Sequence, residues 1–544
     1  MNYSFSKDLK RFSIISIVVG AIAIFYGFWD TPRTVEEAQE KAAAAQHGHN
    51  GHGSVETHHS NQGDVNYKSH NDQEDSYQEE HIDGDDHRSD SAENVDDDLQ
   101  NFHSSDHLID QTADSDENVY NGESQDEKIS SELQYADSDE HQQGHDAESI
   151  GTNTHSVQYP SKDTHENVGG HDTHIDHGKH LLHQFKNKPW ASVYVSALFF
   201  LFIALGTLAF YAVQRASQAG WPIVLFRVME SITAYLIPGG LIVLVILLFS
   251  VYGANHLFVW TDSKVVEHDV IIQNKSWYLN DAGFLFRALV ILLGWGLYRT
   301  YARKFSIKQD QDVAPSINYH KKNFKLSAGF LVFYIISVSV MSWDWLMSID
   351  PHWFSTLFGW YVFASMFVTG ITVIALMTIY LKSKGYLDFV NSSHIHDLAK
   401  FMFGISIFWT YLWFSQFMLI WYSNIPEEVT YFISRLEDYR LPFLSLLILN
   451  FVFPVLVLMN TDFKRTNYIV IITGIVIVIG HYMDVFNMVM PGTVGDQWSL
   501  GLVEIGAFLF FLGLFIQIVF RSLEKVPLLA KGDPLVQESK RFHY

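Results

Sequence analysis

Long apolar runs alternate with short polar segments along most of this chain. A helix needs about 20 residues to cross a bilayer, since each residue rises about 1.5 Å. Ten runs are long enough, and they lie near residues 12–29, 191–212, 234–259, 284–301, 326–349, 354–381, 401–422, 441–459, 468–486 and 498–520. The pattern predicts an all-α polytopic membrane protein, with about ten transmembrane helices surrounded by membrane lipids.

Residues 31–189 interrupt this pattern as one long polar block. The block holds 36 Asp and Glu against 9 Lys and Arg, a net charge of −27, whereas the whole chain carries −24. Such a composition buries too little apolar surface to offset the entropy of ordering, so we expect a disordered acidic insert. The block also holds 19 of the 27 histidines, but a flexible chain gives no fixed coordination geometry, and we expect no specific metal site.

The positions of Lys and Arg predict the orientation. If the N-terminus is inside, the short outer loops carry only Lys264, Lys275, Arg435 and Arg440, and most other Lys and Arg lie inside. We therefore expect a multi-pass protein of the bacterial inner (plasma) membrane, with both termini cytoplasmic and the insert periplasmic. The inverted topology is the alternative.

The first apolar run has a second interpretation as a cleaved signal peptide. Lys10 and Arg11 precede it, and the alanines at 43–45 offer a small-residue cleavage site. That site lies well beyond the apolar core, past Asp30 and Arg33, so a retained transmembrane helix over residues 1–30 is the preferred interpretation.

The chain contains no cysteine. This excludes cysteine-ligated iron–sulfur clusters, covalent c-type haem and disulfides. Phosphate-binding glycine loops, nucleophile elbows and zinc-protease motifs are also missing from the sequence, and nothing indicates nucleic-acid binding. The sequence thus offers no catalytic residue and no covalently bound cofactor, although a bound quinol is possible, and any electron transfer needs redox centres in partner subunits.

Six ionisable residues fall in or near the outer halves of the predicted spans. A charge inside hydrocarbon is costly and is rarely there for packing alone. An imidazole beside carboxylates suits a proton relay, because such groups titrate near neutral pH. The candidate relay residues are Asp344, His481, Asp484, Glu504, His256 and Arg287.

A structural interpretation stays open for several of these residues. Asp344 could pair with Arg287 and fix helix packing, and its tryptophan neighbours suit an interfacial aromatic belt. Asp484 could lie among lipid headgroups, with His481 as a packed, hydrogen-bonded core histidine. Glu504, between apolar neighbours, is the hardest to explain as a solvated charge.

A second group of charged residues lies at the inner ends of the spans. Arg227 and Glu230 are three residues apart on one helix face and are expected to form an ion pair. His394, His396 and Asp397 precede the seventh span. Either group could admit protons, although charges at a helix end are usually solvated or anchoring.

Several motifs resemble those of one membrane protein family. They are the segment from Met341 to Gly370 with its Asp344-Trp345 and Asp350-Pro351-His352 steps, the Ala219-Gly220-Trp221-Pro222 stretch with Arg227 and Glu230, the Pro238-Gly239-Gly240 turn, and His256 to Trp260. In these segments the chain resembles the ActF-type membrane subunits of bacterial alternative complex III, which are NrfD-like.

The resemblance implies two four-helix bundles, of spans two to five and six to nine, plus peripheral helices. It implies an NrfD-like domain over residues 190–524 and a cytoplasmic tail over 525–544. The chain would then be a subunit without redox centres in a quinol:cytochrome c (or oxidase) oxidoreductase. Its partners would be a sister NrfD-like subunit, which usually holds the quinol site, a multihaem cytochrome c and an iron–sulfur subunit.

Three function classes follow from these observations. The preferred one is a membrane subunit of a quinol-oxidising respiratory complex that supports assembly and proton translocation. The second is a proton- or ion-coupled transporter, and the third is a metal-responsive membrane scaffold that uses the histidine-rich insert. The aromatic seventh span could stack a quinol ring, but helix packing explains it more simply.

Overall fold

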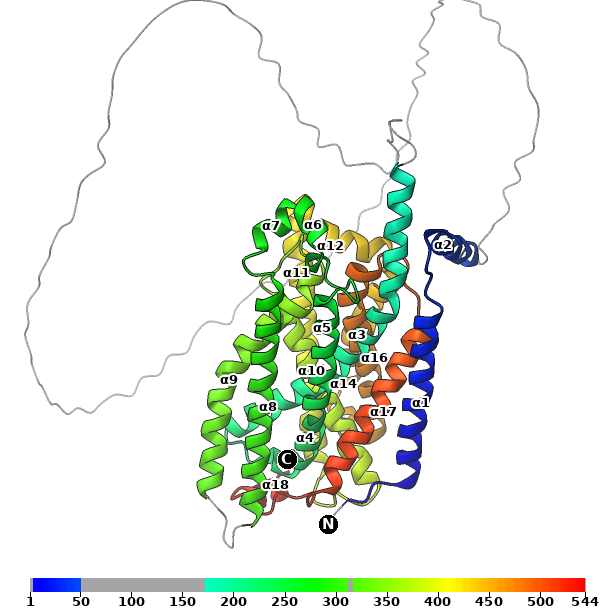
Figure 1. Cartoon of the computed structure of the whole chain (residues 1–544). Coiled ribbons are helices and arrows are strands. Elements are labelled where there is room, and N and C mark those ends of the chain that lie inside the picture. Colours follow the sequence, from blue (N-terminus) through cyan, green and yellow to red (C-terminus); the bar gives the residue numbers. More distant parts are fainter. Residues whose placement is uncertain (1–2, 50–171, 312–316, 544) are drawn as a thin grey trace, which may run out of the picture. The chain divides into compact units, whose positions relative to one another are not determined.

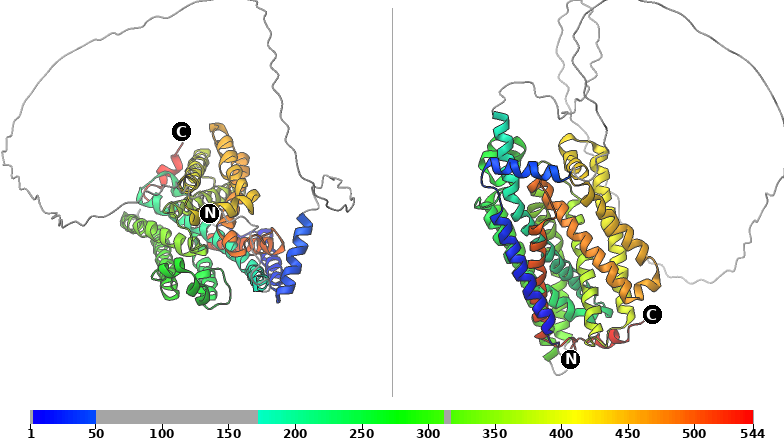
Figure 2. Two further views of the ribbon diagram at one scale, coloured as in Figure 1. Left: turned by 90° about the horizontal axis from the view of Figure 1, so that it is seen from above. Right: turned by 90° about the vertical axis from the view of Figure 1, so that its right-hand side faces the viewer.

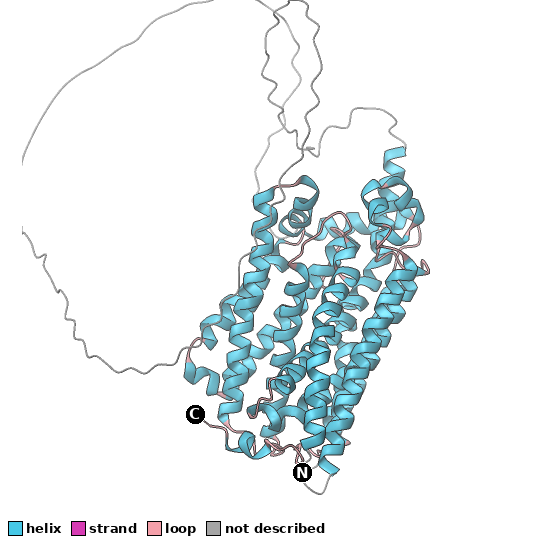
Figure 3. Cartoon of the chain, turned by 90° about the vertical axis from the view of Figure 1, so that its left-hand side faces the viewer, coloured by secondary structure: helices cyan, strands magenta, loops and turns pink. Residues whose placement is uncertain are grey.

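The computed structural model describes residues 3–49, 172–311 and 317–543. All regular structure in these ranges is helical, and no strand occurs in them (Figure 3). Most of the insert predicted to be disordered lies outside the described residues. The structure differs from the predicted boundaries at both ends of the insert, because α2 (Val35–His49) and the first turns of α3 (Asp172–Ala216) are helical.

Ten helical segments of the described chain are long and apolar enough to cross a membrane, as predicted. Each contains or overlaps one of the ten apolar runs, and most extend further into the polar flanks. Seven are single helices or parts of one: α1 (Lys7–Trp29), Gly178–Ala216 of α3, α8 (Asp281–Gln311), α10 (Phe358–Ser383), α11 (Ser392–Ser423), α16 (Asn467–Val494) and α17 (Leu502–Glu524).

The remaining three segments contain breaks in the α-helix. The third segment passes through two 3₁₀ turns, η1 (Trp221–Leu225) and η2 (Thr233–Tyr235), which flank α4 (Phe226–Ile232), before α5 (Leu236–Val251). The fifth is α9 (Ile317–Trp345) followed by the 3₁₀ turn η4 (Met347–Ile349). The eighth joins α13 (Arg440–Leu447) to α14 (Phe453–Leu458) through a π-helical turn, η5 (Ile448–Val452).

The helices form the two four-helix bundles that were predicted. In the first bundle α3 packs on α5 and α9, and α8 closes the ring between them. In the second bundle α10 packs on α11 and α16, and the α13–α14 segment closes the ring. Helices α1 and α17 pack along each other beside α3 and are the peripheral pair (Figure 1).

Two glycines let the bundles approach closely. A Cβ on Gly206 of α3 would lie 1.8 Å from the carbonyl oxygen of Met366, and a Cβ on Gly370 of α10 would lie 2.5 Å from the backbone nitrogen of Thr207. Small residues at helix contacts are typical of membrane proteins. The contact between α3 and α10 therefore fixes one bundle against the other.

Both chain termini lie at one end of the helical body, which we call the terminus end (Figures 1 and 2). The opposite end, called the insert end, carries α2 and three further short helices: α6 (Ser263–His268), α7 (Val270–Lys275) and α12 (Pro426–Glu437). The last helix, α18 (Val536–Arg541), lies at the terminus end. Because successive spans alternate in direction, α3, α8, α10 and α17 run from the insert end to the terminus end.

Candidate functional site

The six residues of the predicted relay occupy four places rather than one. Hydrogen bonds or ion pairs join Arg287 to Asp344 in the first bundle and His481 to Asp484 in the second. Glu504 lies at the start of α17 and His256 lies in the loop after α5. Both members of the second-bundle pair are buried, whereas the Arg287 side chain is 21% exposed, so the second-bundle pair forms the centre of the candidate site.

Asp484 lies on α16 and is completely buried. Its Oδ1 accepts a hydrogen bond from the hydroxyl of Tyr361, and its Oδ2 accepts bonds from Ser365 at 2.7 Å and from the indole nitrogen of Trp409 at 3.0 Å. Tyr361 and Ser365 come from α10 and Trp409 from α11. The carboxylate thus joins three helices of the second bundle and has donors on both oxygens.

His481 lies one turn before Asp484 and is also buried. Its Nδ1 lies 3.0 Å from the hydroxyl of Ser365 and 3.4 Å from Asp484 Oδ2. Because Ser365 has one hydroxyl proton and donates it to Asp484, its oxygen must accept from His481 Nδ1–H. The serine therefore links imidazole to carboxylate in one hydrogen-bonded chain, with Nε2 left as the acceptor of the ring.

Polar side chains continue from Tyr361 towards the insert end. Tyr361 borders a small cavity together with Gln416, Arg435 and Asn487, all of them buried. The volume of this cavity is about 10 Å³, which is about the space that one water molecule needs. The guanidinium of Arg435 lies 3.3 Å from the ring centroid of Tyr431, and its Nη1 donates to the Tyr431 carbonyl at 2.7 Å.

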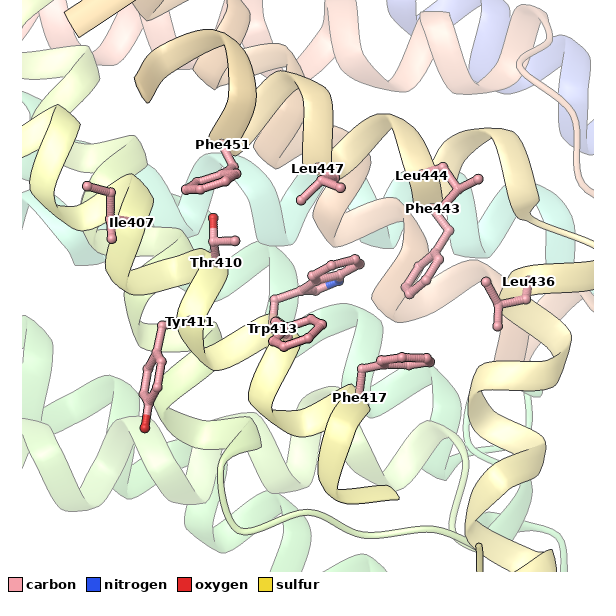
Figure 4. A pocket seen from close by; sticks show the side chains of 11 residues that line it. Ile407, Thr410, Tyr411, Trp413, Phe417, Leu436, Phe443, Leu444, Leu447 and Phe451 are labelled. Carbon is pink, nitrogen blue, oxygen red and sulfur yellow. The ribbon is translucent and has the colours of Figure 1, made fainter. Parts of the chain in front are cut away.

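An apolar groove of about 590 Å³ lies beside this cavity, between α11, α12 and the α13–η5 segment (Figure 4). Trp413 and Phe443 border both the groove and the cavity. The groove holds five of the aromatic and aliphatic side chains of α11, so both helix packing and a surface facing lipid account for the aromatic seventh span. Thr410 and Tyr411 are its only polar lining residues among those described.

The residues around Asp484 do not fit a quinol headgroup. The groove is large enough for an apolar chain, but the cavity that connects it to Tyr361 has space for about one water molecule and not for a ring. A quinol ring therefore has no space beside Asp484 in this structure.

The Asp344–Arg287 pair matches the structural interpretation. Asp344 is completely buried on α9 and accepts bonds from Arg287 Nε at 2.7 Å and Nη2 at 3.1 Å. The guanidinium also donates to the carbonyl of Tyr278 at 3.0 Å and stacks 4.1 Å from the centroid of its ring. This bidentate pair ties α8 to α9 at the insert end.

Glu504 has a local structural role at the start of α17. Its Oε2 accepts from the backbone N–H of Gly501 at 2.9 Å, and its Oε1 accepts from Ser192 at 3.1 Å. The bond to Gly501 is the return half of a capping box, which satisfies a donor at a helix start. Glu504 therefore ties α17 to α3.

We expect Glu504→Ala to destabilise the protein by about 0.5–2 kcal/mol, because it removes this capping interaction. Glu504→Gln keeps an oxygen acceptor and is the matched control, with a smaller expected loss. The free energy of unfolding of the two purified variants measures the difference. If Glu504→Gln lost as much stability as Glu504→Ala, the negative charge of Glu504 would matter rather than its acceptor oxygen, and the capping assignment would be wrong.

His256 lies at the insert end, in a pocket of about 540 Å³ that is also lined by His180, His183 and Asp262. The rings of His183 and His256 meet edge to face with centroids 5.0 Å apart. The Asn187 amide donates to the backbone carbonyl of His256 at 2.9 Å and accepts from its backbone N–H at 3.0 Å. Within the described ranges, no three His, Asp or Glu side chains lie in a geometry that could hold a metal ion.

The predicted inner residues also lie in two places. Arg227 Nη1 donates to Glu230 at 2.6 Å, which confirms the expected ion pair, and its Nη2 binds Asp310. His394 caps the start of α11 and contacts the carbonyl of Ser539 through Nε2 at 3.0 Å. His396 is buried beside it, and Asp397 pairs with Lys400 at 3.1 Å.

The C-terminal tail joins these two places, which the sequence did not indicate. Asp533 accepts from the buried Arg215 at 2.7 Å, and Gly532 donates to Asp310 at 2.9 Å. Ser539 donates to the Trp221 carbonyl at 2.6 Å. The tail therefore crosses the terminus end from the first bundle to the second and covers both groups of inner residues.

Asp533 makes the docking of the tail sensitive to acid. Burial alone would raise the pKa of Asp533, but the His320 ring, whose Nδ1 lies 3.7 Å away, and the Arg215 charge outweigh burial and lower the pKa below 3.8. The charged Asp533 therefore stabilises the docked tail fully above pH 3.8. This stabilisation is lost as the pH falls through the lower pKa that Asp533 has in the folded protein. We expect hydrogen exchange of the tail to rise in that acidic range.

The Asp533→Asn variant is the control for the tail, since it cannot titrate. Exchange in its tail should be faster at neutral pH than in the wild type and should change less on acidification. Tail exchange in the wild type that does not change below pH 3.8 would contradict the role of Asp533.

Fold and site together define an all-α polytopic membrane protein with a buried carboxylate–serine–imidazole chain in its second bundle. No protein-family model matches the chain, and no curated protein matches it.

Proposed function

We propose that this chain is an integral membrane subunit of a respiratory quinol-oxidising complex and that its second four-helix bundle carries protons. The observation that carries the proposal is the buried Asp484–Ser365–His481 chain. His481 lies 14 residues after the first residue of α16, about 21 Å along the helix. Burying an ionisable pair at that depth in an apolar bundle costs free energy, and ionisable residues inside membrane spans usually mark a functional site.

The chemistry of this site suits proton transfer and not electron transfer. Ser365 can pass a proton between the imidazole and the carboxylate without moving, since it bonds to both. Tyr361 continues the hydrogen-bonded chain towards the insert end, because its hydroxyl donates to the other carboxylate oxygen of Asp484. The chain has no cysteine, so iron–sulfur clusters and c-type haem belong to partner subunits.

The resemblance to ActF-type subunits supports the choice of a quinol-oxidising complex. It makes a sister NrfD-like subunit, a multihaem cytochrome c and an iron–sulfur protein the expected partners. The poor fit of a quinol ring at Asp484 agrees with quinol oxidation in the sister subunit. The Lys and Arg pattern supports a bacterial inner membrane with the terminus end cytoplasmic and the insert end periplasmic.

The transporter alternative receives less support. Transporters often carry broken helices at corresponding places of two repeats. Here 3₁₀ turns interrupt the second helix of the first bundle and follow its fourth helix, and the π turn interrupts the third helix of the second bundle. The breaks therefore do not correspond. The scaffold alternative depends on the histidine-rich insert, most of which lies outside the described residues.

Purification of the tagged chain from its native membranes under mild detergent tests the proposal. The complex should contain c-type haem, visible as a reducible absorbance band, and cytochrome and iron–sulfur subunits in stoichiometric amounts by mass spectrometry. A homogeneous preparation without haem would contradict the respiratory assignment. Substrate-dependent ion flux by that preparation would favour the transporter.

A further inference from the structure

Three fully buried polar side chains lie beside the inner part of the second bundle. They are Asn450 on the π turn, Ser406 on α11 and Thr473 on α16, each with no exposed surface. Among the described residues, the side-chain oxygen and nitrogen of Asn450 and the hydroxyls of Ser406 and Thr473 have no hydrogen-bond partner. The same holds for Nε2 of His481.

These side chains extend from His481 towards the terminus end. The amide oxygen of Asn450 faces Gly480, where a Cβ would lie 2.0 Å from it, and Gly480 directly precedes His481. Ser406 lies one turn before Trp409, whose ring meets His481 edge to face at 5.4 Å. Thr473 lies eight residues before His481 on α16, about 12 Å along the helix.

Leaving such groups unpaired is energetically unfavourable. A buried donor or acceptor without a partner costs about 1–3 kcal/mol, and lipid offers no hydrogen bonds to repay that cost. Buried polar groups without protein partners usually bind ordered water. The missing side chain of Gly480 lets the amide of Asn450 on the π turn approach α16 closely, and π turns often occur at functional sites.

We propose that Asn450, Ser406 and Thr473 hold a file of buried water molecules that begins at His481 Nε2. The role of this file in proton transfer rests on the proposed function, but the binding of water does not. Asn450 is the key residue, because it can both donate to and accept from water and faces Gly480, the residue that precedes the histidine.

The file completes a proton path through His481 with balanced steps. The water next to His481 gives one proton to Nε2 and takes one from the next water of the file, so the file delivers a proton from the terminus end. Nδ1 gives one proton to Ser365, which passes its own proton to Asp484 and leaves that carboxyl neutral. The imidazole then returns to a neutral state with the proton on the other nitrogen. A reset of the ring, by rotation or reverse transfer, is needed before the next proton.

Hydroxyl-radical footprinting in oxygen-18 water tests the water file directly, on the full-length protein in lipid nanodiscs. Radicals formed by radiolysis of bound water label neighbouring side chains even when these are buried. We expect labelling of Trp409 and of Met402, which is buried on α11 one turn before Ser406. Trp295 of the first bundle is equally buried and has its indole nitrogen bonded to Ser337 at 2.9 Å, so it should stay unlabelled.

Variants of Asn450 sharpen the test. Asn450→Leu removes the polar anchor at similar volume, and labelling of Trp409 should fall severalfold, whereas Asn450→Ser should keep most of it. Asn323→Leu is the matched control, because Asn323 of the first bundle is also fully buried with both amide atoms unpaired within the described chain. It should leave the labelling of Trp409 unchanged.

The outcomes separate this inference from the proposed function. If Trp409 were labelled no more strongly than Trp295, the water file would be overturned, whether or not the chain purifies with haem subunits. Labelling that is equal in wild type and Asn450→Leu would also overturn it, since Asn450 would not anchor the water. Labelling that responds to Asn450, in a preparation without haem, would sustain the water file and refute only the respiratory assignment.

Discussion

Proton-coupled turnover should fall by about 10²- to 10⁴-fold in the Asp484→Asn variant, the range that a positioned acid or base contributes. Asparagine keeps the volume of aspartate and can still accept from Tyr361. It cannot carry a proton, so the chain from His481 through Ser365 ends there. Its amide nitrogen would also face the indole donor of Trp409, which adds about 1–3 kcal/mol of instability.

The measurement is quinol oxidation and proton release together, by the whole complex in proteoliposomes. Trp409→Phe is the matched control, because it removes one hydrogen bond to Asp484 without removing a titratable group. We expect it to lower stability and to keep most of the turnover. If Asp484→Asn assembled normally and released protons at the wild-type ratio and rate, the carboxylate would be structural and the proposed path would be wrong.

The sequence predicted the helices well, because hydrophobic length is a local property. All ten apolar runs correspond to long helical segments, and the i, i+3 spacing correctly predicted the ion pair between Arg227 and Glu230. The pairing of the bundles followed from the family resemblance, and helix contacts confirm it. Local pattern and resemblance were therefore sufficient for the architecture.

Contacts between helices were the part that the sequence could not supply. Ser365, Tyr361 and Trp409 complete the Asp484 site from two other helices, and nothing in their own neighbourhoods distinguishes them from packing residues. Asp344 and Glu504 had been grouped with this site because each lies in an apolar sequence. Burial of a charge shows that it has a partner, but only the fold shows which partner.

Two signals in the sequence could have improved the prediction. Glu504 follows Gly501 by three residues at the start of an apolar helix, which is the spacing of a capping box. Arg435 was counted as a charge of an outer loop, but the amphipathic helix α12 turns its side chain inward over Tyr431. A charge next to a predicted span can thus belong to the interior of the bundle.

The Arg287–Asp344 pair should behave as a structural ion pair, with the largest stability effect that we expect outside the Asp484 site. Arg287→Met leaves Asp344 buried without its partner, and removing one member of a buried pair costs about 3–5 kcal/mol. The Arg287 side chain is 21% exposed, so the lower part of this range applies. The free energy of unfolding in detergent micelles, compared with that of the wild type, is the quantity to measure.

Two further variants distinguish packing from proton transfer. Arg287→Lys keeps the charge but loses the bidentate geometry, so its loss should be smaller. The double variant Arg287→Met, Asp344→Leu replaces the pair by apolar side chains and should recover most of the stability, because no charge is then left unpaired. A double variant that is stable but no longer releases protons would instead place Asp344 in the path, since apolar packing can replace an ion pair but cannot carry a proton.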